Sequence, residues 1–144
     1  MSADKDICDP ARGAEESSDH LSSRGVRIYI CTTCDDGEAA HIERKTAGQH
    51  LFDQVAEACR RQAGIEVVPV ECLAVCERPV SVAYQAPEKW SYILGDVDPM
   101  RDADDVLAAA QAIGSSVSGI PPMSERPRFF LHGVISRLPP ANFA

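Results

Sequence analysis

The chain has 144 residues, a size that fits one domain with tails rather than two substantial domains. Its 22 acidic and 14 basic residues give a formal net charge of -8, opposite in sign to the basic surface that nucleic acids attract. Because the sequence has no apolar signal segment at its start and no run of about 18 apolar residues, we expect a cytoplasmic protein with neither membrane nor nucleic acid as partner.

The first predicted element follows a polar tail. Residues 1–25 are rich in charge and serine and hold few hydrophobic side chains, which predicts a disordered segment. From Val26 the sequence VRIYIC alternates apolar and polar residues and is rich in β-branched and aromatic types. We therefore expect the first strand over 26–31.

A helix and a second strand come next. Thr46 followed three residues later by Gln49 is a capping-box pattern, and apolar residues then recur at helical spacing, which predicts a helix over 46–63. The sequence IEVVPVE at 65–71 predicts a strand. Its internal Pro69 favours an edge position or a bulge in the sheet.

The last third of the chain predicts a hairpin, a helix and an arm. Apolar runs at 80–85 and 90–95 flank a short turn and predict antiparallel strands. A second helix is expected to begin near Asp102 and to carry its apolar stripe through Val117. Beyond it, the apolar residues from Phe130 to Leu138 fit one face of a further helix, so we expect a helical C-terminal arm.

Four of the six cysteines form two pairs, each directly after a predicted strand. The pairs are Cys31-Thr-Thr-Cys34 and Cys72-Leu-Ala-Val-Cys76, and one helix lies between them. A strand–helix–strand unit is right-handed and returns the second strand parallel to the first, so both pairs emerge at the same edge of the sheet. We expect the four thiolates to converge from two adjacent loops.

Converging thiolates suit either a zinc ion or an iron–sulfur cluster, because both prefer tetrahedral sulfur around each metal. Zinc knuckles favour two C-x-x-C turns, whereas three residues separate Cys72 from Cys76. A domain with a core of its own also needs no zinc to hold it together. The sequence therefore favours a functional iron–sulfur cluster and keeps zinc as the alternative.

A dithiol oxidoreductase is the third hypothesis, since C-x-x-C after a first strand is also the thioredoxin arrangement. In that mechanism the N-terminus of the helix that follows directly activates the first thiol. Here Asp35 and Asp36 follow the pair, the helix is expected only from Thr46, and the two carboxylates would raise the pKa of a thiol. The sequence thus disfavours this hypothesis.

The order strand, cysteine loop, helix, strand, C-x-x-x-C loop, hairpin and helix resembles the thioredoxin-like [2Fe-2S] ferredoxins, including the corresponding subunit of respiratory complex I. Four segments together resemble more closely a bacterial family of small proteins of unknown function labelled as predicted metal-binding. These segments are CTTC, VECLAVCERPVSVAYQAPEKWSYILGDVDP, SERP and GVISRLPP, and the match spans about residues 26–140. In one respect the chain departs from the ferredoxins, which usually place more residues between their first two cysteines.

The resemblance implies a single α/β domain with a thioredoxin-like βαββα core. In this interpretation residues 1–25 are the disordered tail, residues 26–118 are the ferredoxin-like domain, and residues 119–144 are an arm that packs on the core or on a partner subunit. Homologous ferredoxins also suggest a homodimer.

The resemblance also implies that Cys31, Cys34, Cys72 and Cys76 are the ligands of a [2Fe-2S] cluster. The expected role is then a one-electron carrier for an unidentified redox partner, not an enzyme. Because members of the family are associated with cobalamin and cobalt-related genes, the alternative is a zinc- or cobalt-binding or delivery protein without a redox role.

The remaining cysteines and charges receive simpler interpretations. Cys59 lies on the apolar face of the first helix and is expected to be a small core residue, and Cys8 is expected to be a free thiol in the tail. Around a cluster, Arg78 would stabilise the reduced state, and Asp35, Asp36, Glu71 and Glu77 would oppose it.

Overall fold

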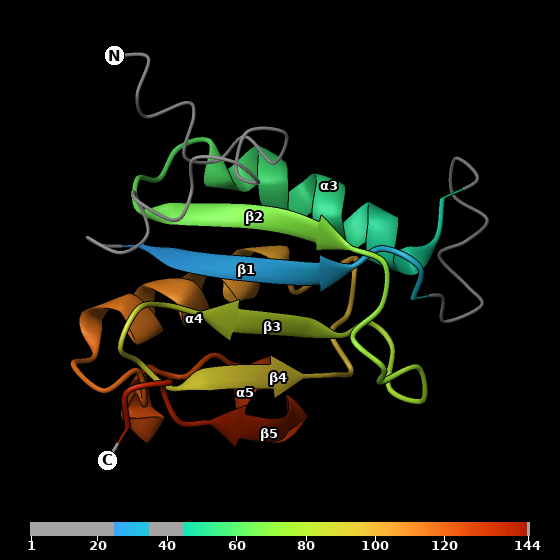
Figure 1. Ribbon diagram of the computed structural model, residues 1–144. Coiled ribbons are helices and arrows are strands. Elements are labelled where there is room, and N and C mark those ends of the chain that lie inside the picture. The colour runs from blue at the N-terminus through green and yellow to red at the C-terminus, as the bar shows by residue number, and fades with distance from the viewer. Residues whose placement is uncertain (1–24, 35–44, 144) are drawn as a thin grey trace.

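The computed structural model describes residues 25–34 and 45–143 (Figure 1). In chain order the elements are β1 (Val26–Cys31), α3 (Ala47–Cys59), β2 (Ile65–Val70), β3 (Val82–Gln85), β4 (Ser91–Leu94), α4 (Ala103–Ser115), the 3-10 helix η2 (Met123–Glu125), α5 (Arg128–Gly133) and β5 (Val134–Leu138). The tail predicted over 1–25 lies, apart from Gly25, outside the described residues. None of the described helices has the length and apolar character needed to cross a membrane.

One five-stranded sheet carries the fold, with the strand order β2-β1-β3-β4-β5. Strands β1 and β2 are parallel, and the other neighbouring strands are antiparallel. The predicted α/β class, the parallel first pair and the β3–β4 hairpin are therefore confirmed. Pro69 lies in β2 at an edge of the sheet, as its missing N–H led us to expect.

The helices gather on one face of the sheet (Figure 1). Helices α3 and α4 both contact β1 and also contact each other. The alternation of β1 explains this arrangement, because Val26, Ile28 and Ile30 are buried while Arg27 and Tyr29 are only partly covered. The buried set faces the helices and forms the centre of the core.

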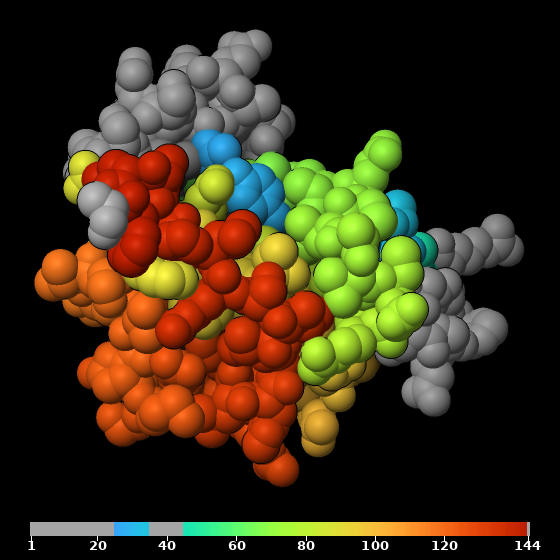
Figure 2. Space-filling view, turned by 60° about the horizontal axis from the view of Figure 1, so that its bottom comes forward, coloured from blue at the N-terminus to red at the C-terminus, as the bar shows by residue number. Residues whose placement is uncertain are grey.

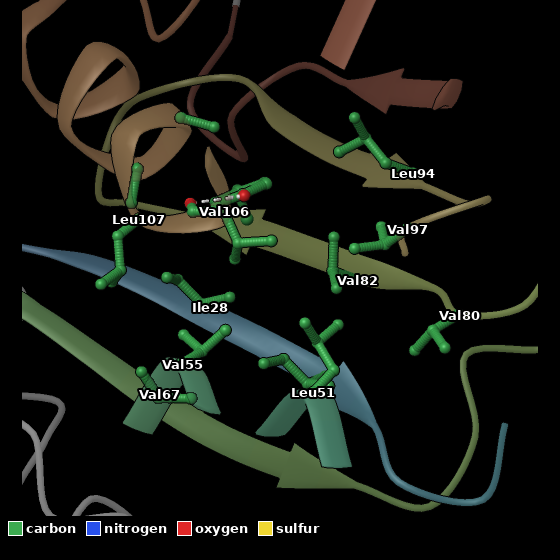
Figure 3. Packing of buried hydrophobic residues seen from close by; sticks show 14 of the residues in the cluster. Ile28, Leu51, Val55, Val67, Val80, Val82, Leu94, Val97, Val106 and Leu107 are labelled. Carbon is green, nitrogen blue, oxygen red and sulfur yellow. Dashed lines mark hydrogen bonds between the residues drawn. The ribbon is translucent and has the colours of Figure 1, made fainter. Parts of the chain in front are cut away.

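The core is a layer of aliphatic side chains between the sheet and the two long helices (Figure 3). Aromatic rings extend the core from β3 and β4 to α5. The ring of Phe130 in α5 lies 4.9 Å from that of Tyr92 and 6.2 Å from that of Tyr84. Around Ile28 the aliphatic part contains Leu51, Val55, Val67, Val82, Leu94, Val106 and Leu107.

The helix predicted along the C-terminal arm is wrong beyond Gly133. Helix α5 ends there, and the chain continues as β5, which pairs with β4. The β-branched residues Val134 and Ile135 suit a strand, and β4 would otherwise present an unpaired edge. The arm therefore completes the sheet with β5 and contributes Phe130 to the core.

The long helices are shorter than the sequence predicted. The Thr46 hydroxyl caps α3 by accepting the Gln49 N–H at 3.0 Å, as expected, but the helix ends at Cys59. Helix α4 ends at Ser115, and Val117 lies beyond it with 93% of its surface exposed. The expectation that Val117 belongs to the apolar stripe of this helix is therefore wrong.

Candidate functional site

Both cysteine pairs lie at one edge of the sheet, where β1 and β2 end (Figure 1). Cys31 is the last residue of β1 and is the register partner of Val70, the last residue of β2. Cys72 follows two residues later. The predicted placement of the pairs on two adjacent loops is thus confirmed, and it follows from the parallel β1–α3–β2 unit.

The loop of the first pair is hydrogen-bonded to the end of β2. The N–H and the hydroxyl of Thr32 both donate to the Val70 carbonyl oxygen, at 2.8 and 3.1 Å. The Thr33 hydroxyl donates to the Glu71 carbonyl oxygen, and the Cys31 thiol donates to the same oxygen at 3.4 Å. The two threonines of CTTC therefore fix the first loop against the start of the second.

The first turn of α3 lies against the same loop. The Thr46 hydroxyl donates to the Thr32 carbonyl oxygen, and the Gly48 N–H donates to the Cys34 carbonyl oxygen at 2.9 Å. A Cβ atom on Gly48 would lie 1.9 Å from the Cys31 carbonyl oxygen, so only glycine fits this approach. The helix N-terminus is therefore next to the first cysteine pair.

This contact corrects one step of the sequence argument. The helix does begin just after Thr46, as predicted, but the chain returns so that its N-terminus meets the CTTC turn. The distance along the sequence was therefore a poor guide to the distance in space. Asp35 and Asp36, which were expected to raise the pKa of a thiol, lie outside the described residues.

Cys31 and Cys34 are both buried, with 1% and 6% of their surfaces exposed. Their pKa values are shifted in opposite directions. Burial opposes the Cys31 thiolate, but hydrogen bonds from Cys34, from Thr33 and from the Leu73 N–H outweigh it and lower the pKa of Cys31. For Cys34, burial and the neighbouring Cys31 raise the pKa, although Ser81 favours the thiolate. The first pair is thus one interacting unit.

The second pair is exposed and also interacts. The hydrogen bond with Cys72 and the charge of Cys72 raise the pKa of Cys76, and the charge of Cys31 adds to them. The Ala74 N–H donates to the Cys72 sulfur at 3.1 Å, and Ala74 itself has a positive φ of 64°. Cys31 therefore interacts with the second loop in two ways: it accepts a hydrogen bond from the Leu73 N–H, and its charge raises the pKa of Cys76.

The chemistry of these side chains fits a cluster. No set of three or more His, Cys, Asp or Glu side chains within residues 25–34 and 45–143 is already arranged to hold a metal ion. The donors nevertheless suit two irons, because two pairs of thiols follow adjacent strands and backbone N–H groups of the second loop interact with Cys31 and Cys72. In the described part of the chain the free cysteines are Cys31, Cys34, Cys72 and Cys76.

The other two cysteines stand apart from this set. Cys59 is fully buried in the core, as predicted, and is disulfide-bonded. Its sulfur is therefore not available as a ligand beside the two pairs. The prediction that Cys8 is a free thiol concerns a residue outside the described part of the chain.

Arg78 does not offer an unpaired cation to the cysteines. Its guanidinium donates to one carboxylate oxygen of Asp96 at 2.9 and 2.6 Å and to the His132 carbonyl oxygen at 3.4 Å. Because Asp96 partly neutralises this cation, Arg78 would stabilise a reduced cluster less than the sequence suggested. The same contacts hold the loop after β2 beside the C-terminal segment, and Figure 2 shows this loop in yellow-green next to the orange-red residues.

Sequence reasoning missed Ser81, which touches the first pair. Its side chain is fully buried, and its hydroxyl oxygen lies 3.5 Å from the Cys34 sulfur. In the sequence Val80-Ser81-Val82 a small polar residue between two valines reads as the outward side of a half-buried strand. No signal in the sequence distinguishes it from an exposed serine.

Comparisons with known proteins agree with the fold. A family model described as a protein of unknown function (DUF1636) matches residues 28–140, and no curated protein matches the chain. A solved thioredoxin-like [2Fe-2S] ferredoxin from Aquifex aeolicus has a TM-score of 0.51 and 16% identity, covering 83% of this chain and 99% of the ferredoxin. A second structure, the wild-type ferredoxin of that description from the same organism, has a TM-score of 0.46 and 16% identity and covers 78% and 98%. The first likeness shows a thioredoxin-like fold.

Proposed function

The chain belongs to the DUF1636 family, whose function is unknown, and we propose that it binds a [2Fe-2S] cluster and carries single electrons. The proposed ligands are Cys31, Cys34, Cys72 and Cys76. The observation that carries the proposal is the position of two pairs of free cysteines directly after the adjacent parallel strands β1 and β2. The fold that the chain shares with a [2Fe-2S] ferredoxin supports it.

The two pairs differ in exposure, and we assign them different tasks. Cys31 and Cys34 are buried under the first turn of α3, so they would keep their side of the site away from water. Cys72 and Cys76 are exposed, so they would lie on the side that a redox partner approaches. An electron carrier requires a redox group that is shielded from water on one side and accessible to its partner on the other.

The backbone would stabilise the bound group through its N–H donors. The Leu73 N–H favours a charged Cys31 sulfur, and the Ala74 N–H donates to Cys72. When bound, a [2Fe-2S] cluster supplies reversible gain and loss of one electron without bond breaking in the protein. The added negative charge is stabilised by these donors and by the hydroxyls near the sulfur atoms.

Hydrogen bonds to other parts of the chain hold both cysteine loops, and with them these N–H donors, in place. The threonines of CTTC bond to the end of β2, and Arg78 ties the second loop to Asp96 and to the carbonyl of His132. A rigid first coordination sphere lowers the reorganisation that electron transfer would need. These contacts would hold the loops in place during electron transfer.

Metal and sulfide analysis of anaerobically purified protein tests the proposal. We expect brown protein with broad visible absorption, about two irons and about two sulfides per chain, and a paramagnetic signal on one-electron reduction. Colourless protein that holds one zinc and no sulfide would contradict the proposal and support the metal-binding alternative. Reduction of insulin disulfides by metal-free protein, lost in Cys31→Ser, would instead identify a dithiol oxidoreductase.

A further inference from the structure

Ser81 is a buried polar residue whose hydroxyl faces a proposed ligand. None of its surface is exposed, and its hydroxyl oxygen is 3.5 Å from the Cys34 sulfur. Burying a hydroxyl without a hydrogen-bond partner is unfavourable. The Cys34 sulfur supplies such a partner for Ser81. The contact links the start of β3 to the CTTC loop, which are 47 residues apart in the sequence.

The backbone of Ser81 holds the same pair of cysteines. The Cys31 N–H donates to the Ser81 carbonyl oxygen at 3.1 Å, and the Ser81 N–H favours the charged form of the Cys34 sulfur. Ser81 thus contacts both members of the first pair: Cys31 through its carbonyl oxygen, and Cys34 through its hydroxyl and its N–H. This arrangement fixes where the Cys34 sulfur lies.

The direction of the side-chain hydrogen bond depends on the state of Cys34. While Cys34 is a thiol, either the sulfur or the oxygen can donate. A cysteine that ligates a metal has lost its proton, so its sulfur can only accept. The Ser81 hydroxyl must then be the donor, and in a buried place it has little competition from water.

We infer that Ser81 is a positioning residue that donates a hydrogen bond to the ligand sulfur of Cys34 and raises the reduction potential of the cluster. The inference rests on the proposed function. A reduced cluster carries one more negative charge, and part of this charge lies on the cysteine sulfurs. A donor to such a sulfur stabilises the reduced state more than the oxidised state, which shifts the potential upward.

Ser81→Ala is the decisive variant because it removes the hydroxyl and keeps the backbone donors. Ser91→Ala is the matched control, since β3–β4 pairing places Ser91 at the opposite end of the sheet from Ser81. Both variants are purified with their clusters, and their iron and sulfide contents are measured first. The readouts are the midpoint potential, from a redox titration of the visible absorption, and the Fe–S stretching bands in the resonance Raman spectrum.

We expect Ser81→Ala to hold the same amount of iron as the wild type, to have a more negative midpoint potential and to show shifted Fe–S bands. Ser91→Ala should match the wild type in all three. A Ser81→Ala protein with an intact cluster and unchanged potential and bands would overturn the role of Ser81 and leave the proposed function standing. A wild type without an iron–sulfur cluster would overturn both.

Discussion

The Gly48 N–H donates to the carbonyl oxygen of Cys34 at 2.9 Å, so the first turn of α3 rests directly on the loop of the first cysteine pair. The missing side chain makes this approach possible, because a Cβ atom would lie 1.9 Å from the carbonyl oxygen of Cys31. The atoms that a Cβ at Gly48 would meet belong to the backbone of Cys31 and Thr32, which cannot easily move away. The contact therefore makes position 48 a sensitive point of the site.

We predict that Gly48→Ala destabilises the protein and reduces its iron content. Alanine is favoured over glycine in a helix by about 1 kcal/mol, but overpacking typically costs about 1–3 kcal/mol and is worst against backbone. Because the clash is with backbone, the cost should lie at the upper end of this range, so we expect a net loss of about 2 kcal/mol in the free energy of unfolding, measured by denaturant unfolding.

Gly114→Ala is the control for this prediction, because Gly114 is also a helical glycine. A Cβ atom there would meet a methyl carbon of Val26 at 3.2 Å, which a small shift can relieve. We expect stability close to that of the wild type and full iron content. Equal effects of the two substitutions would contradict the importance of the contact between Gly48 and the cysteine loop.

Substitution of the proposed ligands should remove the visible absorption. We expect Cys72→Ser and Cys76→Ser each to lose most of the iron, since an oxygen ligand replaces a thiolate at an exposed position. Cys59→Ala should keep the visible spectrum even if the loss of its disulfide and of packing lowers stability. Loss of colour in Cys59→Ala, or its full retention in Cys72→Ser, would refute the assignment of the site.

Two buried tyrosines should respond in opposite ways to the same substitution. The Tyr84 hydroxyl donates to the Val106 carbonyl oxygen at 2.7 Å, whereas the buried Tyr92 hydroxyl has no hydrogen-bond partner among the described residues. We expect Tyr84→Phe to lower the free energy of unfolding by about 1 kcal/mol and Tyr92→Phe to leave it unchanged or raise it. Denaturant unfolding of both variants checks this, and a larger loss for Tyr92→Phe would be inconsistent with it.

Tyr84 should also contribute to alkaline unfolding. Burial and, to a lesser extent, the charge of Asp105 raise the pKa of Tyr84 well above its ordinary value of 10.0. The unfolded chain then releases this proton at lower pH than the folded chain, so stability is retained below about pH 10 and falls as the pH rises above it. The free energy of unfolding of Tyr84→Phe should fall less steeply over this range, and an equal slope would exclude the contribution.

The single tryptophan reports on the C-terminal segment. The ring of Trp90 lies 5.5 Å from that of Phe143, and the Arg137 guanidinium lies 4.9 Å from its centre. We expect Phe143→Ala to shift Trp90 fluorescence to longer wavelength because water reaches the indole, with a stability loss below about 1 kcal/mol. Met123→Ala, which removes an exposed side chain elsewhere, should leave the emission unchanged. An unshifted Phe143→Ala spectrum would show that this ring does not cover Trp90.

Local pattern and chain topology account for what the sequence predicted correctly. The alternation in VRIYIC predicted β1 over its observed length, and the handedness of a strand–helix–strand unit placed both cysteine pairs at one edge. The arm was harder, because the apolar residues from Phe130 to Leu138 fit a helical face as well as a short helix followed by a strand. The residues after Gly133 form a strand because they can pair with the otherwise unpaired edge of β4. The sequence of the arm alone does not show that this edge is available.

The parts of the site that the sequence did not predict depend on contacts between distant segments. The approach of Gly48 to Cys34 spans residues 35–44, whose length had suggested separation. Ser81 meets Cys34 only after β3 has paired with β1. A glycine early in a helix was the one available hint, since glycine is unfavourable there unless close packing requires it.

The pairing of β5 with β4 has a consequence for the order in which the protein is made. Residues 134–138 leave the ribosome after the other strands of the sheet, so the edge of β4 stays open until they emerge. The Arg78 contact with the His132 carbonyl, which holds the second cysteine loop, forms only at that stage. We therefore expect the second cysteine loop to be held in place only after these residues have emerged, and chains that stop before Val134 to aggregate through the open edge of β4.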